Sequence, residues 1–263
     1  MTLTLLQIVL GAASGSLVGL TLGLVGGGGS ILAVPLMVYV VGVTNPHVAI
    51  GTSALAVAVN AGANVINHAR AGNVKWRCAL VFAIAGVAGA FGGSSLGMLV
   101  DGQKLLALFA LLMLTVAALM FRSRSNCGDA NVRLSLENAP KLVTLGGLTG
   151  MFSGFFGIGG GFLVVPSLMA ATRMPIIFAV GSSLVAVCAF GLTTAANYAI
   201  SGLIDWQLAG VFIAGGLLGG FFGARLARKL ALRKGLLNSI FAGLIALVAS
   251  YMLYRSATVF GLI

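Results

Sequence analysis

The sequence predicts an all-α membrane protein built from two inverted structural repeats, each with a glycine-broken helix or helical hairpin. About 8–10 membrane segments are expected in total, the long ones with about 20 apolar residues each. Three observations lead to this prediction. Charged residues are scarce, long apolar runs follow one another, and the second half of the chain repeats the glycines, prolines and tryptophans of the first.

The composition excludes an ordinary soluble domain. Charged residues make up 7% of the chain against roughly a quarter in soluble domains, and the mean hydropathy is +1.12. No Lys, Arg, Asp or Glu precedes Arg70. Continuous apolar runs without alternation argue against a β-barrel, so helices must satisfy the backbone groups inside the bilayer. The further uncharged runs are 78–100, 105–121, 142–172, 174–204, 206–224 and 235–254.

The net charge of +11 does not indicate a nucleic-acid partner. The basic residues lie in short loops between apolar runs, as the positive-inside rule expects, and form no basic face on a soluble domain. The three cysteines lie far apart, which indicates neither a disulfide framework nor a zinc site. With no nucleotide motif, metal cluster or catalytic triad in the sequence, we expect no enzyme activity, no cofactor and no metal.

The internal repeat is the most informative feature. A shift of 131 residues matches six glycines in 15–29 to glycines in 146–160, and after a one-residue gap a shift of 130 continues the match. Random apolar sequence would align Leu and Ala, but not prolines and tryptophans as well. Those landmarks are Pro35 on Pro166 and Trp76 on Trp206.

The repeat divides the chain into unit 1 (1–121), a polar cytoplasmic linker (122–141) and unit 2 (142–263). In unit 1 we expect helical segments at about 5–25, from Ile31 through Pro35, 46–67, 78–99 and 105–121. In unit 2 they become about 142–156, 162–171, 177–200, 207–224 and 236–254. The segments after the glycine clusters either cross the membrane or re-enter it.

An odd number of crossings in each unit inverts the second unit. The loop charges agree with inversion: loop 70–77 holds three basic residues, whereas its counterpart 201–207 holds none. Loop 225–234 holds five, whereas 95–104 holds one. Placing the basic loops in the cytoplasm puts 13 of the 15 basic residues there, with both termini outside. A multi-pass protein of the plasma (inner) membrane is expected.

The glycine clusters at 26–29 and 157–161 are the first candidate site. Dense glycine followed by proline breaks a helix, and a broken helix is tolerated where it faces protein or a water-filled cavity. In inverted-repeat transporters the half-helix N-termini at such breaks face anionic substrate. Close helix packing is the alternative. The predicted substrate-binding residues here are Gly28, Gly29, Ser30, Gly159, Gly160 and Gly161.

Hydroxyl and amide side chains on the two long spans could complete an anion site. They are Thr52, Ser53 and Asn67 in unit 1, and Ser182, Ser183 and Asn197 in unit 2. The hydroxyls could equally bond to their own helix. Asn60 and Asn64 also follow helical spacing, and a packing role against a neighbouring helix is favoured for them. Gly-x-x-x-Gly motifs at 89–93 and 219–223 indicate close helix packing, within one chain or in a homodimer.

The glycine-rich break running into Pro35, the Gly51-Thr52-Ser53 span ending in Asn67-His68, and their second copies resemble the sulfite exporter TauE/SafE-like membrane proteins. The resemblance covers about 17–230. It implies a plasma-membrane carrier for small sulfur-containing anions, such as sulfite, sulfoacetate or related organosulfonates, in either direction.

The expected function is therefore transport of small sulfur-containing anions by alternating access. The expected partners are a small anionic substrate and the lipid bilayer. An anion channel on the same repeat fold is one alternative, and a structural or receptor-like membrane protein is another, although paired helix breaks would be hard to explain in the latter.

Overall fold

The structure is a computed structural model that describes residues 3–122, 138–159, 161–230 and 234–259. These residues form helices joined by short loops, with no strand among them. In chain order the helices are α1 (Leu5–Val25), η1 (Gly26–Leu32), α2 (Ala33–Pro35), η2 (Leu36–Val40), α3 (Pro46–Arg70), α4 (Trp76–Leu99), α5 (Gly102–Arg122), α6 (Ala139–Phe156), α7 (Gly161–Thr172), α8 (Ile176–Ile200), α9 (Trp206–Leu230) and α10 (Lys234–Val259).

The all-α membrane fold is confirmed. Among the described residues, five helices are long and apolar enough to cross a membrane: Leu5–Leu24, Pro46–Arg70, Trp76–Leu99, Ile176–Ile200 and Trp206–Gly223. Three shorter apolar helices accompany them, at Gly26–Val40, Gly102–Ala118 and Gly161–Thr172.

The helix ends differ slightly from the expected ones. Helix α6 begins at Ala139 rather than near 142, because Pro140 suits the first turn of a helix, where its missing N–H costs nothing. Helix α9 continues to Leu230, past the expected end near 224. Residues 123–137, which make up most of the predicted linker, lie outside the described residues.

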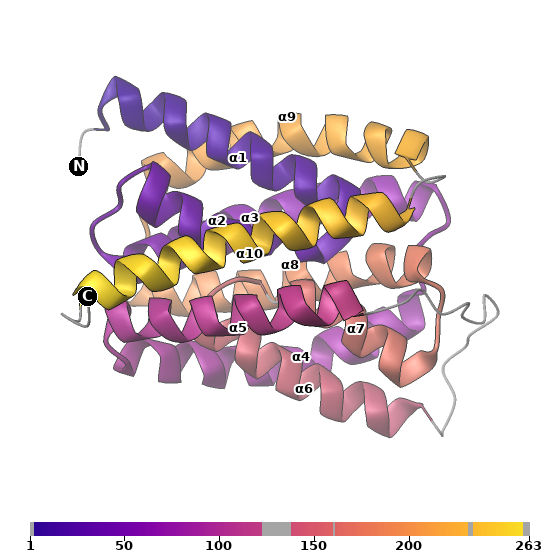
Figure 1. The fold of residues 1–263 in the computed structure, drawn as a ribbon. Coiled ribbons are helices and arrows are strands. Elements are labelled where there is room, and N and C mark those ends of the chain that lie inside the picture. The colour runs from indigo at the N-terminus through magenta and orange to yellow at the C-terminus, as the bar shows by residue number, and fades with distance from the viewer. Residues whose placement is uncertain (1–2, 123–137, 160, 231–233, 260–263) are drawn as a thin grey trace.

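Counterpart helices of the two units run in opposite directions. In Figure 1, α1 and α3 begin at the left end of the molecule, whereas their counterparts α6 and α8 begin at the right end. The same holds for α5 and α10, and the reverse for α4 and α9. These directions are compatible with an inverted repeat.

The helix pairs also recur between the units. Helix α1 packs along α9, and α6 packs along α4. The backbones approach so closely that a side chain at Gly19 would collide with the carbonyl of Gly216, and one at Gly150 with the carbonyl of Gly86. The shift of 131 pairs Gly19 with Gly150, and the shift of 130 pairs Gly86 with Gly216, so the two contacts are equivalent. Small residues allow such approach in membranes, where packing replaces the hydrophobic effect as the driving force.

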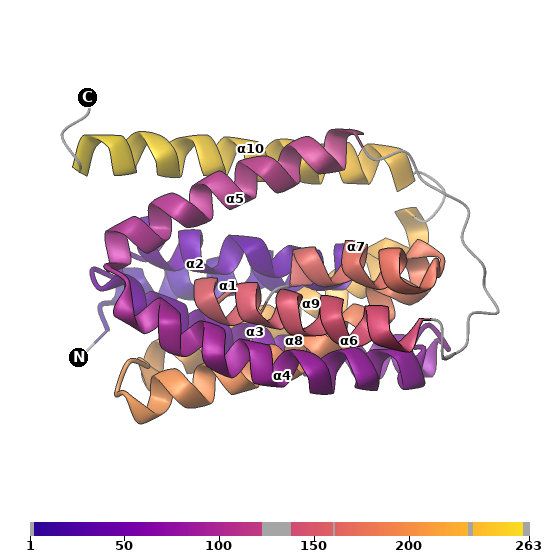
Figure 2. The same ribbon diagram turned by 90° about the horizontal axis from the view of Figure 1, so that it is seen from below.

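Helices α3 and α8 pack against each other in the interior, and each also contacts one of the outer pairs. Helices α5 and α10 form a separate pair, which lies at the top of Figure 2, on the opposite side of the molecule from α4. The two tryptophans, Trp76 and Trp206, are exposed at the first residues of α4 and α9, which begin at opposite ends of the molecule. Such positions suit interfacial anchors.

Candidate functional site

Both glycine clusters begin at a residue with positive φ. Gly26 has a φ of +72° and ends α1, and Gly157 has a φ of +66° and ends α6. Side chains disfavour this conformation, so glycine is required at the two equivalent positions. The units then diverge, since η1 starts at once in unit 1, whereas in unit 2 a turn through Gly159 leads to α7 at Gly161.

The two breaks lie against each other inside the molecule. The backbones of Gly27 and Gly161 are so close that a side chain on either residue would collide with the other. The N–H of Gly27 also donates to the Ser183 hydroxyl on α8, over 3.3 Å. The structure therefore brings together segments more than 130 positions apart in the sequence.

Two bulky side chains that the prediction omitted pack on the breaks. Val180 on α8 lies against Gly26, and Ile50 on α3 lies against Gly157. The 130-residue shift pairs Ile50 with Val180, so the same packing occurs in both units. The repeat itself was the signal that could have found this pair.

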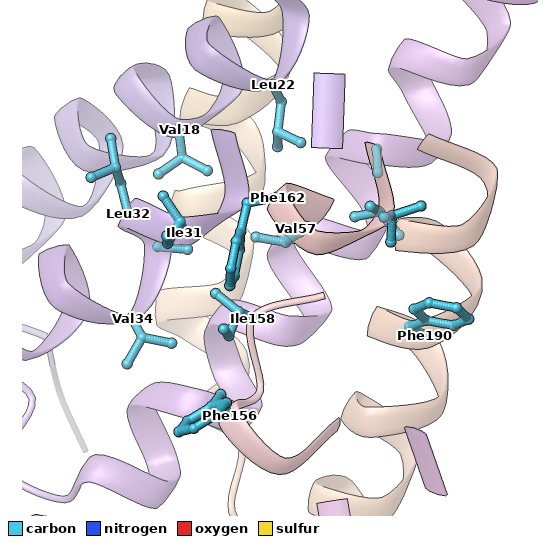
Figure 3. Packing of buried hydrophobic residues seen from close by; sticks show 14 of the residues in the cluster. Val18, Leu22, Ile31, Leu32, Val34, Val57, Phe156, Ile158, Phe162 and Phe190 are labelled. Atoms are coloured by element: carbon cyan, nitrogen blue, oxygen red, sulfur yellow. The ribbon is translucent and has the colours of Figure 1, made fainter. Parts of the chain in front are cut away.

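The surroundings of the breaks are apolar. Figure 3 shows Ile31, Val57, Ile158 and Phe162 gathered near one another, contributed by η1, α3, the second glycine cluster and α7. All four are buried, and no Lys, Arg, Asp or Glu side chain is buried among the described residues. An anion here would have to be held by backbone N–H groups and neutral side chains.

Three of the predicted hydroxyls are fully buried and bonded locally. Ser30 donates to the carbonyl of Gly27 over 2.9 Å. Ser53 and Ser183 each donate to the carbonyl three residues earlier, over 3.0 and 2.8 Å. These are the own-helix bonds that the sequence left open as an alternative, and a hydroxyl must rotate away from its carbonyl before it can donate to a ligand.

Thr52 and Ser182 attach loops of the opposite unit. The N–H of Asp205 donates to Thr52 Oγ1 over 3.0 Å, and the N–H of Lys75 donates to Ser182 Oγ over 2.9 Å. The two bonds are equivalent under the 130-residue shift. Each hydroxyl therefore has a partner other than a ligand in this conformation.

The two predicted asparagines lie away from the breaks. Asn67 is exposed, fifteen residues beyond Thr52 on α3, or about 22 Å along the helix at 1.5 Å per residue. Asn197 is near the end of α8, where its Nδ2 donates to the hydroxyls of Ser94 and Ser95 over 2.7 and 3.0 Å. The structure thus separates these amides from the glycine clusters.

The remaining predicted glycines divide between the two units. Gly28 and Gly29 are buried in η1, where Gly29 lies directly against Thr21 of α1. Gly159 lies against Val57 and Val187, and Gly161 lies at the first residue of α7. The prediction for Gly160 lies outside the described residues.

The chain is similar to known membrane transporter proteins. The family model for sulfite exporter TauE/SafE matches residues 11–252. A protein of Xylella fastidiosa (strain Temecula1) named "Probable membrane transporter protein" is 54% identical over 97% of this chain and 98% of its own length. A Bacillus subtilis protein named "Probable membrane transporter protein YunE" is 27% identical over 85% of this chain and 88% of its own. No solved structure matches the chain significantly.

The family match covers nearly all of the helices, including both glycine breaks and the paired spans α3 and α8. The relatives carry membrane-transporter names and align along almost the whole chain. The chain belongs to the sulfite exporter TauE/SafE family of membrane transporters.

Proposed function

We propose that this transporter carries small sulfur-containing anions, such as sulfite, sulfoacetate or related organosulfonates, and that it does so by alternating access. The observation that carries the proposal is the contact between the two glycine breaks at Gly27 and Gly161. It supports a single site, shared by the two units, to which both contribute a helix start.

Helix starts favour anions. Helix α7 begins at Gly161, and a second apolar helical segment runs from Gly26 to Val40. The first N–H groups of a helix have no partner within it, and the helix dipole adds partial positive charge there. Each start is worth about 0.3–1 kcal/mol when exposed and up to about 2 kcal/mol when partly buried.

Hydrogen bonds to an ionised ligand add about 1.5–3 kcal/mol each. Backbone N–H groups at the breaks, together with Ser30, Ser53 and Ser183, are the donors that we propose for a bound oxyanion. A small oxyanion of low charge fits such neutral donors better than a large or multiply charged one, because less hydration has to be replaced.

The burial of the site supports alternating access. Every candidate residue that the structure describes at the breaks is buried, so a ligand held there would be closed off from both ends of the molecule. Exchange with either side then requires one helix group to move against the other, which inverted-repeat carriers achieve by rocking. The antiparallel counterparts α3 and α8 are the helices between which we expect this movement.

Basic residues would attract anions to one end of the molecule. Arg70, Lys75, Arg77 and Arg173 lie at or beside the ends of α3, α4 and α7 that share the right side of Figure 1. We place this end in the cytoplasm. Positive charge there raises the local anion concentration, an effect that salt screens over about 10 Å at 0.1 M.

Uptake and efflux by proteoliposomes, with labelled sulfite, thiosulfate and sulfonates, test the proposal. A carrier gives a flux that saturates with substrate concentration. An unlabelled anion on the opposite side of the membrane should also exchange with the labelled one. Flux of single-channel size in electrical recordings would instead establish an anion channel. Absence of flux for every oxyanion would contradict the proposed function.

A further inference from the structure

The most unusual polar side chain lies outside the predicted site, in the middle of α3. Asn60 is fully buried, and neither its Oδ1 nor its Nδ2 has a hydrogen-bond partner among the described residues. The amide packs directly on the backbone of Gly216 in α9. Buried amides almost always have partners, so an unpartnered one indicates a ligand or a water.

The other unit shows that the fold does not need an amide at this place. The 130-residue shift pairs Asn60 with Phe190, and Phe190 packs on Gly86, which is the counterpart of Gly216. An apolar side chain fills the equivalent position without loss of the helix contact. The sequence favoured packing against a neighbouring helix for Asn60, and the amide does pack on α9, but it makes no hydrogen bond there among the residues described.

The neighbouring turns of α3 connect Asn60 to the glycine breaks and to the end of the helix. One turn earlier, Val57 lies against Gly159 of the second break. One turn later, Asn64 donates from Nδ2 to the carbonyl of Asn60 over 2.9 Å, while its own Oδ1 has no partner. The helix then continues to exposed Asn67. Amide groups therefore follow α3 from the breaks to one end of the molecule.

We propose that Asn60 is a substrate-binding residue on the route between the glycine breaks and the end of α3, and that this route runs between α3 and α9. Its Nδ2 donates to an oxygen of a small oxyanion, and its Oδ1 accepts from a water that accompanies the anion. This inference rests on the proposed transport of small oxyanions, and it applies to unit 1 alone, since Phe190 stands at the equivalent place in unit 2.

Replacing Asn60 with leucine separates a binding role from a structural one. Isothermal titration with sulfite should show a dissociation constant raised about tenfold to a hundredfold, which corresponds to losing one hydrogen bond to a charged ligand. Without ligand, the melting temperature of Asn60→Leu should equal or exceed that of the wild type, because an unpartnered buried amide has been removed. Proteoliposome uptake should show the same increase in KM.

Phe190→Leu is the matched control, because it changes the equivalent position from one apolar side chain to another. It should leave the dissociation constant for sulfite within about twofold of the wild type, since no hydrogen bond is removed. Asn60→Ser keeps a donor in a smaller side chain and should bind sulfite with intermediate affinity. It also provides a test if the leucine variant does not fold.

The outcomes distinguish this inference from the function on which it rests. If wild-type protein neither binds nor transports sulfite or any sulfonate, the proposed function fails. If the wild type binds sulfite and Asn60→Leu and Asn60→Ser bind it equally well, Asn60 holds a structural water and the inference is wrong. A lower melting temperature with unchanged affinity would also overturn it.

Discussion

Gly27 and Gly161 lie in direct backbone contact, although they come from different units and are separated by about half of the chain. Because glycine lacks a Cβ, the two segments can meet and leave their backbone groups near a common point. Both helical segments that start there are apolar, and no charged side chain is buried among the described residues. This contact is the observation on which we base the proposal of a site shared by the two units.

The inverted repeat predicts that equivalent loops lie on opposite sides of the membrane. Single cysteines at Asn73, between α3 and α4, and at Ser201, between α8 and α9, should be labelled by an impermeant maleimide from opposite faces. The native cysteines would be replaced first. Labelling of both sites from the same face would contradict the inverted arrangement.

Gly28→Leu should abolish transport while the protein remains inserted in the membrane. Gly28 is buried in η1, and a leucine there would block the approach of a ligand to the backbone N–H groups. Gly210→Leu is the control, since Gly210 is exposed on α9 and nothing lies within 4 Å of an added Cβ. Equal uptake rates for the two variants would show that the substrate binds elsewhere in the protein.

The hydroxyl of Thr52 should stabilise the fold rather than bind the ligand in this conformation. Thr52→Val removes the acceptor for the N–H of Asp205 and should lower the free energy of unfolding by about 1 kcal/mol. Thr52→Ser keeps the hydroxyl and should cost less. Thermal unfolding in detergent measures both variants, and a Thr52→Val protein of wild-type stability would show that the bond contributes nothing.

Helix α4 offers a direct test of close packing. A Cβ at Gly89 would collide with the carbonyl of Gly147 in α6, so Gly89→Ala should push the helices apart and lower the melting temperature. Gly92→Ala adds a methyl group on the open side of α4, where it should be neutral or raise stability by about 0.5–1 kcal/mol through helix propensity. Similar melting temperatures for the two variants would mean that α4 and α6 do not approach this closely.

The helices could be predicted from sequence because the uncharged runs give the length of each helix and the repeat gives the order of the helices. The 130-residue shift also pairs Thr52 with Ser182. It could not show that each accepts an N–H from a loop of the other unit, because that bond depends on how α3 crosses α8.

The sequence could not predict that the amide of Asn60 lacks a hydrogen-bond partner among the described residues. Helical spacing placed Asn60, Asn64 and Asn67 on one face, but spacing does not identify the helix that this face meets. The identity of Gly216 as the neighbour follows from the pairing of α3 with α9, a tertiary contact. Glycines likewise indicated close approach without identifying the carbonyl that each one approaches.

The proposed anion site at the glycine breaks is tested most directly by measuring whether it prefers anions or cations. Isothermal titration of the purified protein with sulfite, set against choline under the same conditions, measures it. Helix starts and neutral donors should bind sulfite and leave choline unbound, and Gly28→Leu should lose the sulfite signal. Tighter binding of choline than of sulfite would contradict an anion site and leave the fold without the proposed function.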